Sequence, residues 1–167
     1  MKTFLKILIA IIVVAALCGG VYLVLPETAQ IFVKGYFQYK TDDAAKEKID
    51  SLKKNEIKYA DVQKSGVEKT VNTGVTYGDA LTKKAKTSVW YYEESTNGGF
   101  TITYYGTKVS MDLAKFGSDG TYIDKTLKIV FAFPAEGKST VTIYIGDQVC
   151  DDATKSAALQ ALAYSDI

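Results

Sequence analysis

The chain has 167 residues and a formal net charge of +1; its basic residues are 20 lysines, with no arginine and no histidine. Nucleic-acid-binding surfaces need clustered positive charge, usually with arginine for bidentate contacts, so no nucleic-acid partner is predicted. Without histidine, Ser–His and Cys–His nucleophilic pairs are excluded, and the composition favours a protein that is not an enzyme.

Residues 7–25 form an apolar run of 19 residues without a charged side chain. As a helix the run spans roughly 28 Å, close to the ~30 Å hydrocarbon core of a bilayer. Lys2 and Lys6 precede it and no acidic residue does. The positive-inside rule therefore predicts a single-pass protein of the cytoplasmic membrane, with 1–6 as a short cytoplasmic tail, 7–25 as the transmembrane anchor in the lipid bilayer and 26–167 as an extracytoplasmic α+β domain.

A cleaved signal peptide is the alternative interpretation of the same run. Val14, Ala15 and Ala16 offer small residues for a cleavage site, and cleavage would give a secreted or cell-surface protein. Against cleavage, the apolar run continues to Leu25, so the product would begin with an apolar tail. A retained anchor is the favoured interpretation.

Two helices are predicted after the anchor. Pro26 and Glu27 suit a helix N-terminus, and aromatic residues recur at helical spacing over 27–40. Gly35 in this stretch marks a bend or a close contact. Thr41 is the expected N-cap of a second helix that extends to Lys54.

After residue 54 the secondary-structure pattern is weak at first, and from residue 88 apolar and polar residues alternate clearly. Short strands near 57–62 and 67–75 and a helical turn in 77–86 are predicted first. Alternating apolar residues then predict strands over 88–94, 100–105, 108–113, 127–133 and 141–145, with a break at Gly106 and a final helix from Asp151 or Asp152. The fold class is α+β: an N-terminal transmembrane helix, then two helices packed on a four- or five-stranded antiparallel sheet, with a C-terminal helix.

No catalytic, cofactor or metal site is predicted. Cys150 is either a buried small residue or an intermolecular thiol. The aspartate pairs are better explained as helix caps, and adjacent Glu93 and Glu94 point to opposite faces of a strand. The segment 117–124 lacks the regular oxygen ligands of a calcium loop.

Three aromatic residues are the candidate contact surface. Trp90, Tyr92 and Tyr105 are expected to share the sheet face opposite the core. The alternative is that they pack under the helices, because aromatic residues are common in strands for packing reasons.

Residues 30–55, QIFVKGYFQYKTDDAAKEKIDSLKKN, follow the short anchor as an aromatic-rich helix, a polar break and a lysine-rich helix. With the antiparallel sheet that follows, this layout resembles the NTF2-like extracytoplasmic domains of the VirB8/TcpC type from conjugation and type IV secretion machines. The resemblance implies a domain that assembles with other channel subunits and is not an enzyme.

Three functions are consistent with the sequence. The first is a non-enzymatic, membrane-anchored envelope protein that acts through contacts with other envelope subunits or through self-association, as in a secretion or conjugation apparatus. The second is a pilin-like or other surface filament subunit. The third is a small-ligand binder of NTF2-like design, with a pocket lined by the aromatic residues of 32–39 and 100–133.

Overall fold

The computed structural model describes residues 25–62 and 68–164. The chain divides into two compact units, Met1–Lys34 and Gly35–Ile167, and each is described by itself. Most of the predicted anchor, residues 7–24, lies outside the described residues. Within the described ranges, no helix combines the length and the apolar composition that a membrane crossing requires.

Helix α2 (Glu27–Thr41) begins in the first unit, directly after Pro26. The backbone N–H of Gln30 donates to the Pro26 carbonyl at 3.1 Å, and its side-chain amide donates to the Leu25 carbonyl at 2.8 Å. Glu27 lies in the first turn, where the helix dipole favours a carboxylate. The predicted start of the first helix is therefore confirmed.

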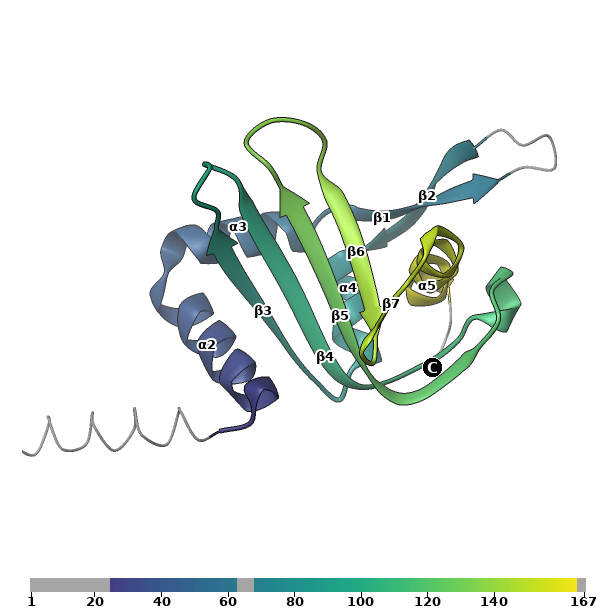
Figure 1. The fold of residues 1–167 in the computed structure, drawn as a ribbon, viewed down its shortest axis with the longest axis horizontal. Helices are drawn as coiled ribbons and strands as arrows, with labels where there is room; N and C mark the ends of the chain where they lie inside the picture. Colours follow the sequence, from purple (N-terminus) through teal and green to yellow (C-terminus); the bar gives the residue numbers. More distant parts are fainter. Residues whose placement is uncertain (1–24, 63–67, 165–167) are drawn as a thin grey trace, which may run out of the picture. The chain divides into compact units, whose positions relative to one another are not determined.

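The second unit holds the rest of α2 and an α+β fold built on a five-stranded antiparallel sheet, which confirms the α+β class and the antiparallel sheet of the prediction (Figure 1). The transmembrane helix of that prediction lies outside the described residues. Before the sheet come α3 (Asp43–Lys53), a hairpin of β1 (Glu56–Val62) and β2 (Glu68–Thr76), and α4 (Tyr77–Lys84). The sheet has the order β3 (Thr87–Glu94), β4 (Phe100–Asp112), β5 (Thr121–Phe133), β6 (Thr140–Ile145) and β7 (Gln148–Val149). A short 3-10 turn, η1 (Ala114–Phe116), joins β4 to β5, and α5 (Asp152–Tyr164) follows β7.

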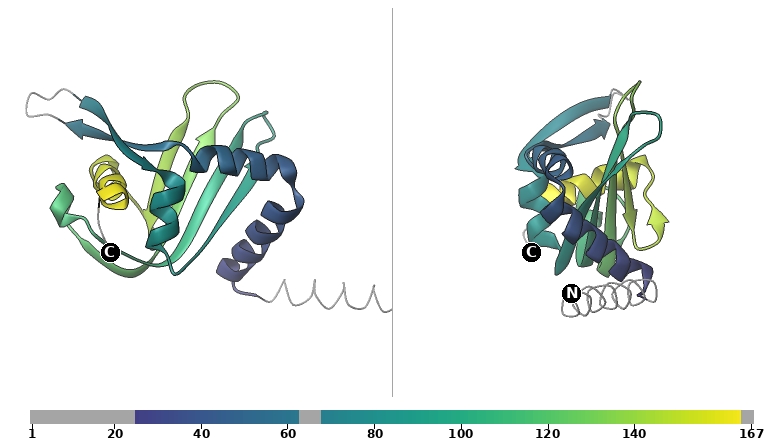
Figure 2. Two further views of the ribbon diagram at one scale, coloured as in Figure 1. Left: turned by 180° about the vertical axis from the view of Figure 1, so that it is seen from behind. Right: turned by 90° about the vertical axis from the view of Figure 1, so that its left-hand side faces the viewer.

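One face of the sheet packs against α3, α4 and α5, as the view from behind shows (Figure 2). Side chains alternate along each strand, so every second residue reaches this face. Tyr104 of β4 lies opposite Ile129 of β5, both are fully buried, and the Tyr104 hydroxyl donates to the Leu81 carbonyl in α4 at 3.1 Å. The largest fully buried side chains are those of Tyr104, Phe131, Ile49, Ile57, Leu81, Ile102, Leu113, Leu127, Ile129, Ile143, Leu162 and Val109.

Strand β4 runs without interruption through Gly106, where the sequence predicts a break. The β4–β5 register shifts between Gly106 and Val109, and Lys108 has a φ of 54°. Before the shift the buried residue is even-numbered Tyr104, and after it the buried residue is odd-numbered Val109. A bulge inserts one residue into a strand and so reverses which residues, even-numbered or odd-numbered, face the core. One continuous strand therefore has the sequence pattern of two separate strands.

Strand β5 also begins earlier than predicted, at Thr121 rather than at 127. Asp124 has a φ of 52°, and the register with β4 shifts again between Lys125 and Tyr122. Residues 123–125 are exposed, so no apolar alternation marks this part of the strand. Hydrogen bonding to β4, rather than burial, makes it a strand.

The N-cap of α3 is Asp42, and the prediction of Thr41 is wrong by one residue. The Asp42 carboxylate accepts a hydrogen bond from the Ala45 N–H at 2.9 Å, and its backbone is extended, as a cap requires. Thr41 is instead the last residue of α2, and its hydroxyl donates to the Phe37 carbonyl at 2.9 Å.

Candidate functional site

Trp90 is part of the core and not of a contact surface. Its side chain is 9% exposed, and its ring centroid lies 5.0 Å from that of Tyr104 and 6.1 Å from that of Phe131. The Lys53 ammonium lies 5.7 Å from the Trp90 ring. The alternative interpretation, packing under the helices, is therefore the one the structure supports for this residue.

Tyr92 and Tyr105 lie on opposite faces of the sheet. Tyr92 is opposite Ile102 in the β3–β4 register and shares the core side with Trp90, whereas Tyr105 is opposite Val89. Both tyrosines are half-buried. The expectation that Trp90, Tyr92 and Tyr105 share one face is therefore wrong, and these residues do not form a common surface.

Of the aromatic residues expected to line a ligand pocket, those of 100–133 are largely packed together, whereas Tyr36 and Phe37 of 32–39 are exposed. Tyr104 and Phe131 are no more than 2% exposed, and the rings of Phe100 and Phe133 stack at 4.7 Å. Side chains from α3 and α4, including Ile49 and Leu81, fill the space above this part of the sheet.

The β3 edge of the sheet is closed by α2. The side-chain amide of Gln38 donates to the Tyr92 carbonyl at 2.8 Å, and its oxygen accepts from the Tyr92 N–H at 2.7 Å. One turn earlier, a Cβ on Gly35 would meet the Val89 side chain and would lie 2.8 Å from the Trp90 carbonyl oxygen. Gly35 therefore marks a close contact, one of the two predicted roles, and lets α2 approach the strand.

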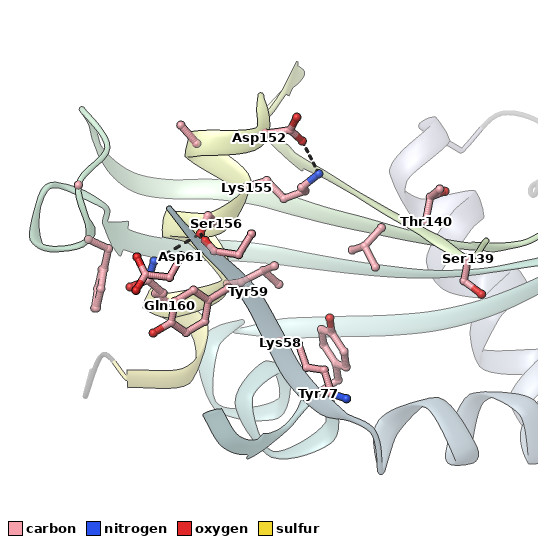
Figure 3. A pocket seen from close by; sticks show the side chains of 16 residues that line it. Lys58, Tyr59, Asp61, Tyr77, Ser139, Thr140, Asp152, Lys155, Ser156 and Gln160 are labelled. Atoms are coloured by element: carbon pink, nitrogen blue, oxygen red, sulfur yellow. Dashed lines mark hydrogen bonds and ion pairs between the residues drawn. The ribbon is translucent and has the colours of Figure 1, made fainter. Parts of the chain in front are cut away.

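A groove of about 740 Å³ opens at the other side of the second unit, between the β1–β2 hairpin and β6 (Figure 3). This volume is within the range of typical ligand pockets, ~300–1,000 Å³. Its walls come from β1 at residues 58–61 and from the start of β6 at residues 139–141, and α5 contributes residues between 152 and 160.

The groove combines apolar and charged side chains. Tyr77, at the start of α4, packs edge-on against Phe131 with ring centroids 4.8 Å apart, and burial raises its pKa to about 12. Its hydroxyl points toward the groove (Figure 3). Lys155 and Asp152 form an ion pair at 2.6 Å on the α5 side. Lys58 and Asp61 bring the charged lining residues to two of each sign, so the groove has no net charge from them.

Helix α5 is fastened to the outer edge of β1 within the groove. The Ser156 hydroxyl donates to the Ala60 carbonyl at 2.6 Å, and the Gln160 amide lies 3.5 Å from the Ser156 oxygen. Leu159 lies beside them and adds apolar surface. The groove is thus a preformed concave surface with a few directed polar groups.

Cys150 lies just before α5 and is half-buried. Burial raises the pKa of its thiol, and the Asp151 carboxylate raises it further. Asp151 caps α5 by accepting from the Thr154 N–H at 2.7 Å, which confirms one of the two predicted caps. A raised pKa lowers the thiolate fraction at neutral pH, which disfavours Cys150 as a nucleophile.

The acidic residues do not gather into a metal site in the part of the chain that the structure describes, where no three acidic or cysteine side chains are grouped. In the segment 117–124, Asp124 lies on β5, and its backbone N–H donates to the Ser110 hydroxyl at 3.2 Å. Asp119 lies in the preceding loop.

Comparison of the chain with models of protein families, with curated proteins and with solved structures finds no match. The resemblance to NTF2-like domains therefore stays a prediction. The groove was not predicted from the sequence, since its lining comes from five separate segments and none of them carries a motif. The sequence did predict one wall of the groove, the short strand at 57–62, but did not predict which strand it pairs with.

Proposed function

We propose that the chain is a non-enzymatic, single-pass envelope protein whose extracytoplasmic α+β unit acts through contacts with other proteins. The observation that carries the proposal is the uninterrupted apolar run of residues 7–25, which stands between two lysines and a folded unit. In this proposal residues 7–25 are a retained transmembrane helix and the folded unit faces outward.

The arrangement of the described polar groups supports a role without catalysis. Asp42 and Asp151 are helix caps, and Asp50 accepts from the Tyr39 hydroxyl at 2.6 Å. The strongly buried tyrosines, Tyr77 and Tyr104, have raised pKa values and stay protonated at neutral pH. These groups serve the fold, and the groove offers main-chain and mixed side-chain surface suited to a protein partner.

The finer part of the proposal is membership of a secretion or conjugation apparatus, with a domain of the NTF2-like, VirB8/TcpC type. Its support is the layout: two consecutive helices, α2 and α3, precede a curved antiparallel sheet. A small-ligand role would instead use the groove beside Tyr77, and a filament role would need self-association.

Crosslinking in native membranes tests the proposal. A lysine-reactive crosslinker suits a chain with 20 lysines. We expect products that join the full chain to other envelope proteins, identified by mass spectrometry of the crosslinked peptides. A chain that stays monomeric in membranes would contradict the proposal, and a ladder of multimers with filaments visible by electron microscopy would favour the filament alternative.

A further inference from the structure

The outer edge of β6 presents unpaired backbone groups to the groove. On the side of β6 away from β5, the Ile143 carbonyl accepts from the Cys150 N–H at 2.8 Å, next to the short β7. Residues two apart on a strand direct their N–H and C=O to the same side. Val141 therefore directs both groups outward, into the groove that it lines, and β7 ends before reaching it.

The outer edge of β1 presents the same kind of groups from the opposite wall. The Ala60 carbonyl points away from β2, because it accepts from Ser156 of α5. By the same rule Lys58 directs its N–H and C=O outward. Ile57, the residue before Lys58, is consistent with this, since its carbonyl faces β2 and accepts from the Thr73 hydroxyl.

These two edges contrast with the β3 edge of the sheet. There Gln38 occupies both outward groups of Tyr92, in the manner of a neighbouring strand. Proteins usually cover or block strand edges, because an open edge pairs with other chains. The described structure leaves the edges at Val141 and Lys58 open, and both face one groove.

We infer that the groove binds an extended segment of a partner polypeptide, whose main chain pairs with the open edges of β6 and β1. Backbone N–H and C=O groups in alternation are recognised by another backbone in the extended conformation. Alternate side chains of the bound segment face Leu159 and Tyr77, and the others face solvent. The inference rests on the proposed function and names its mode of contact.

The charges of the groove define the segment further. Lys58 and Lys155 are matched by Asp61 and Asp152, so the lining favours neither an acidic nor a basic segment. The partner segment is therefore uncharged, with apolar residues at every second position. Its binding changes little with salt concentration, because few ions are displaced.

Peptide selection on the full chain in detergent micelles tests the inference. The probe is a displayed library of random peptides about ten residues long, the length of a long strand. Selected peptides are then measured against Val141→Pro and Val141→Ala. Proline removes the outward N–H and is tolerated on an edge, whereas alanine keeps the N–H and changes only the side chain.

We expect peptides that bind V141A like the unaltered chain and bind V141P about tenfold more weakly, the effect of one lost hydrogen bond. Lys58→Pro, compared with Lys58→Ala, is the second pair and serves if V141P does not fold. Successive N–H groups of the bound segment face β6 and β1 in turn, so methylating any single peptide nitrogen between the two edges should weaken binding. The inference is wrong if no selected peptide is weakened by either proline variant, or if methylating the peptide nitrogens leaves binding unchanged.

The two proposals fail in different ways. A chain that crosslinks to envelope proteins, while its peptide ligands ignore both proline variants, keeps the proposed function and loses the groove as its contact site. A chain that binds peptides in the predicted manner and stays monomeric in membranes keeps the groove and loses the envelope assembly. Salt-dependent peptide binding would contradict the uncharged segment.

Discussion

At the scale of single residues, Gly35 shows how one missing methyl group sets a helix against a strand. Helix propensity favours alanine over glycine by about 1 kcal/mol. A Cβ at this position would nevertheless meet the Val89 side chain and the Trp90 carbonyl oxygen. Backbone oxygen cannot move aside as the end of a flexible side chain can, so crowding outweighs propensity.

Gly35→Ala should therefore destabilise the protein by about 1–3 kcal/mol, the usual cost of overpacking. Urea denaturation followed by circular dichroism measures the change. Ser51→Ala, on the exposed side of α3, is the control and should change stability by less than about 0.5 kcal/mol. Stabilisation by G35A would mean that α2 does not approach β3 in this way.

The cap of α3 gives a second residue-scale prediction. Asp42→Ala removes the acceptor of the Ala45 N–H and should cost about 1 kcal/mol. Asp42→Asn keeps a side-chain oxygen and should retain most of the stability. Asp43→Ala is the matched neighbour, because Asp43 lies in the first turn without being the cap. Equal losses for D42A and D43A would assign the effect to the helix dipole alone.

The sequence prediction made two errors at the scale of single residues: the sheet face assigned to the aromatic residues, and the N-cap of α3. Trp90 and Tyr105 both lie in clear strands, but the alternation within a strand does not say which of its two faces is inside. The pairing of Trp90 with Tyr104 across β3 and β4 decides this, and pairing is a long-range property. The cap moved by one residue for a separate, local reason: α2 continues through Thr41, and Asp42 alone separates it from α3.

At the scale of elements, the contact between α2 and α3 depends on a charged cluster. The Tyr39 hydroxyl donates to Asp50, and the Lys53 ammonium lies 3.6 Å from the same carboxylate and 4.4 Å from the Tyr39 ring. The hydrogen bond from Tyr39 lowers the pKa of Asp50, with the Lys53 charge acting in the same direction. The same hydrogen bond raises the pKa of Tyr39.

This cluster predicts a pH dependence with a definite sign. A carboxyl group with a lowered pKa in the folded state stabilises the fold above its ordinary pKa, 3.8 for this group, and the stabilisation is lost as the pH falls through the folded value. Tyr39→Phe removes this hydrogen bond, so the variant should lose less stability on acidification. The difference in stability between Y39F and the unaltered chain should therefore be smaller at acid pH than at neutral pH. Urea midpoints at neutral and acid pH measure it. A difference independent of pH would exclude Asp50 as the cause.

Gln38 predicts an effect on association as well as stability. Gln38→Ala leaves the N–H and C=O of Tyr92 open at the β3 edge. We expect the free energy of unfolding to fall by about 1–3 kcal/mol, as measured by urea denaturation. We also expect the variant to self-associate, as measured by light scattering. Lys40→Ala, on an exposed position of the same helix, should do neither. Q38A protein that stays monomeric would show that the β3 edge is blocked in another way.

The elements themselves were largely predictable, and the departures are informative. The pattern of α3 and of the strand cores follows from amphipathic spacing, for example Ala45, Ile49 and Leu52 on one helix face. The bulge near Lys108 was not predictable, since it is a shift in the register between β4 and β5, and strand pairing is a long-range property. The groove between β1 and β6 depends on how separate elements pack, which no local pattern records.

At the scale of the whole molecule, the intact mass of the protein recovered from native membranes distinguishes the two interpretations of residues 7–25. We expect a mass that includes the apolar run, because the run extends to Leu25 without a break. A mass that begins after Ala16 would instead indicate signal cleavage and a secreted or surface protein.

The two hydrogen bonds between the Gln38 amide and the Tyr92 backbone also limit how many copies an assembly built by strand pairing can contain. An open-ended assembly by edge pairing requires two open edges on every sheet, so that each copy pairs with one neighbour at each edge. In the described part of the five-stranded sheet, the amide of Gln38 occupies the outward groups of Tyr92 at the β3 edge, whereas the outward groups of Val141 in β6 face the groove. Such a sheet terminates a chain of strands after a single addition, so its stoichiometry through this route is one partner strand per protomer.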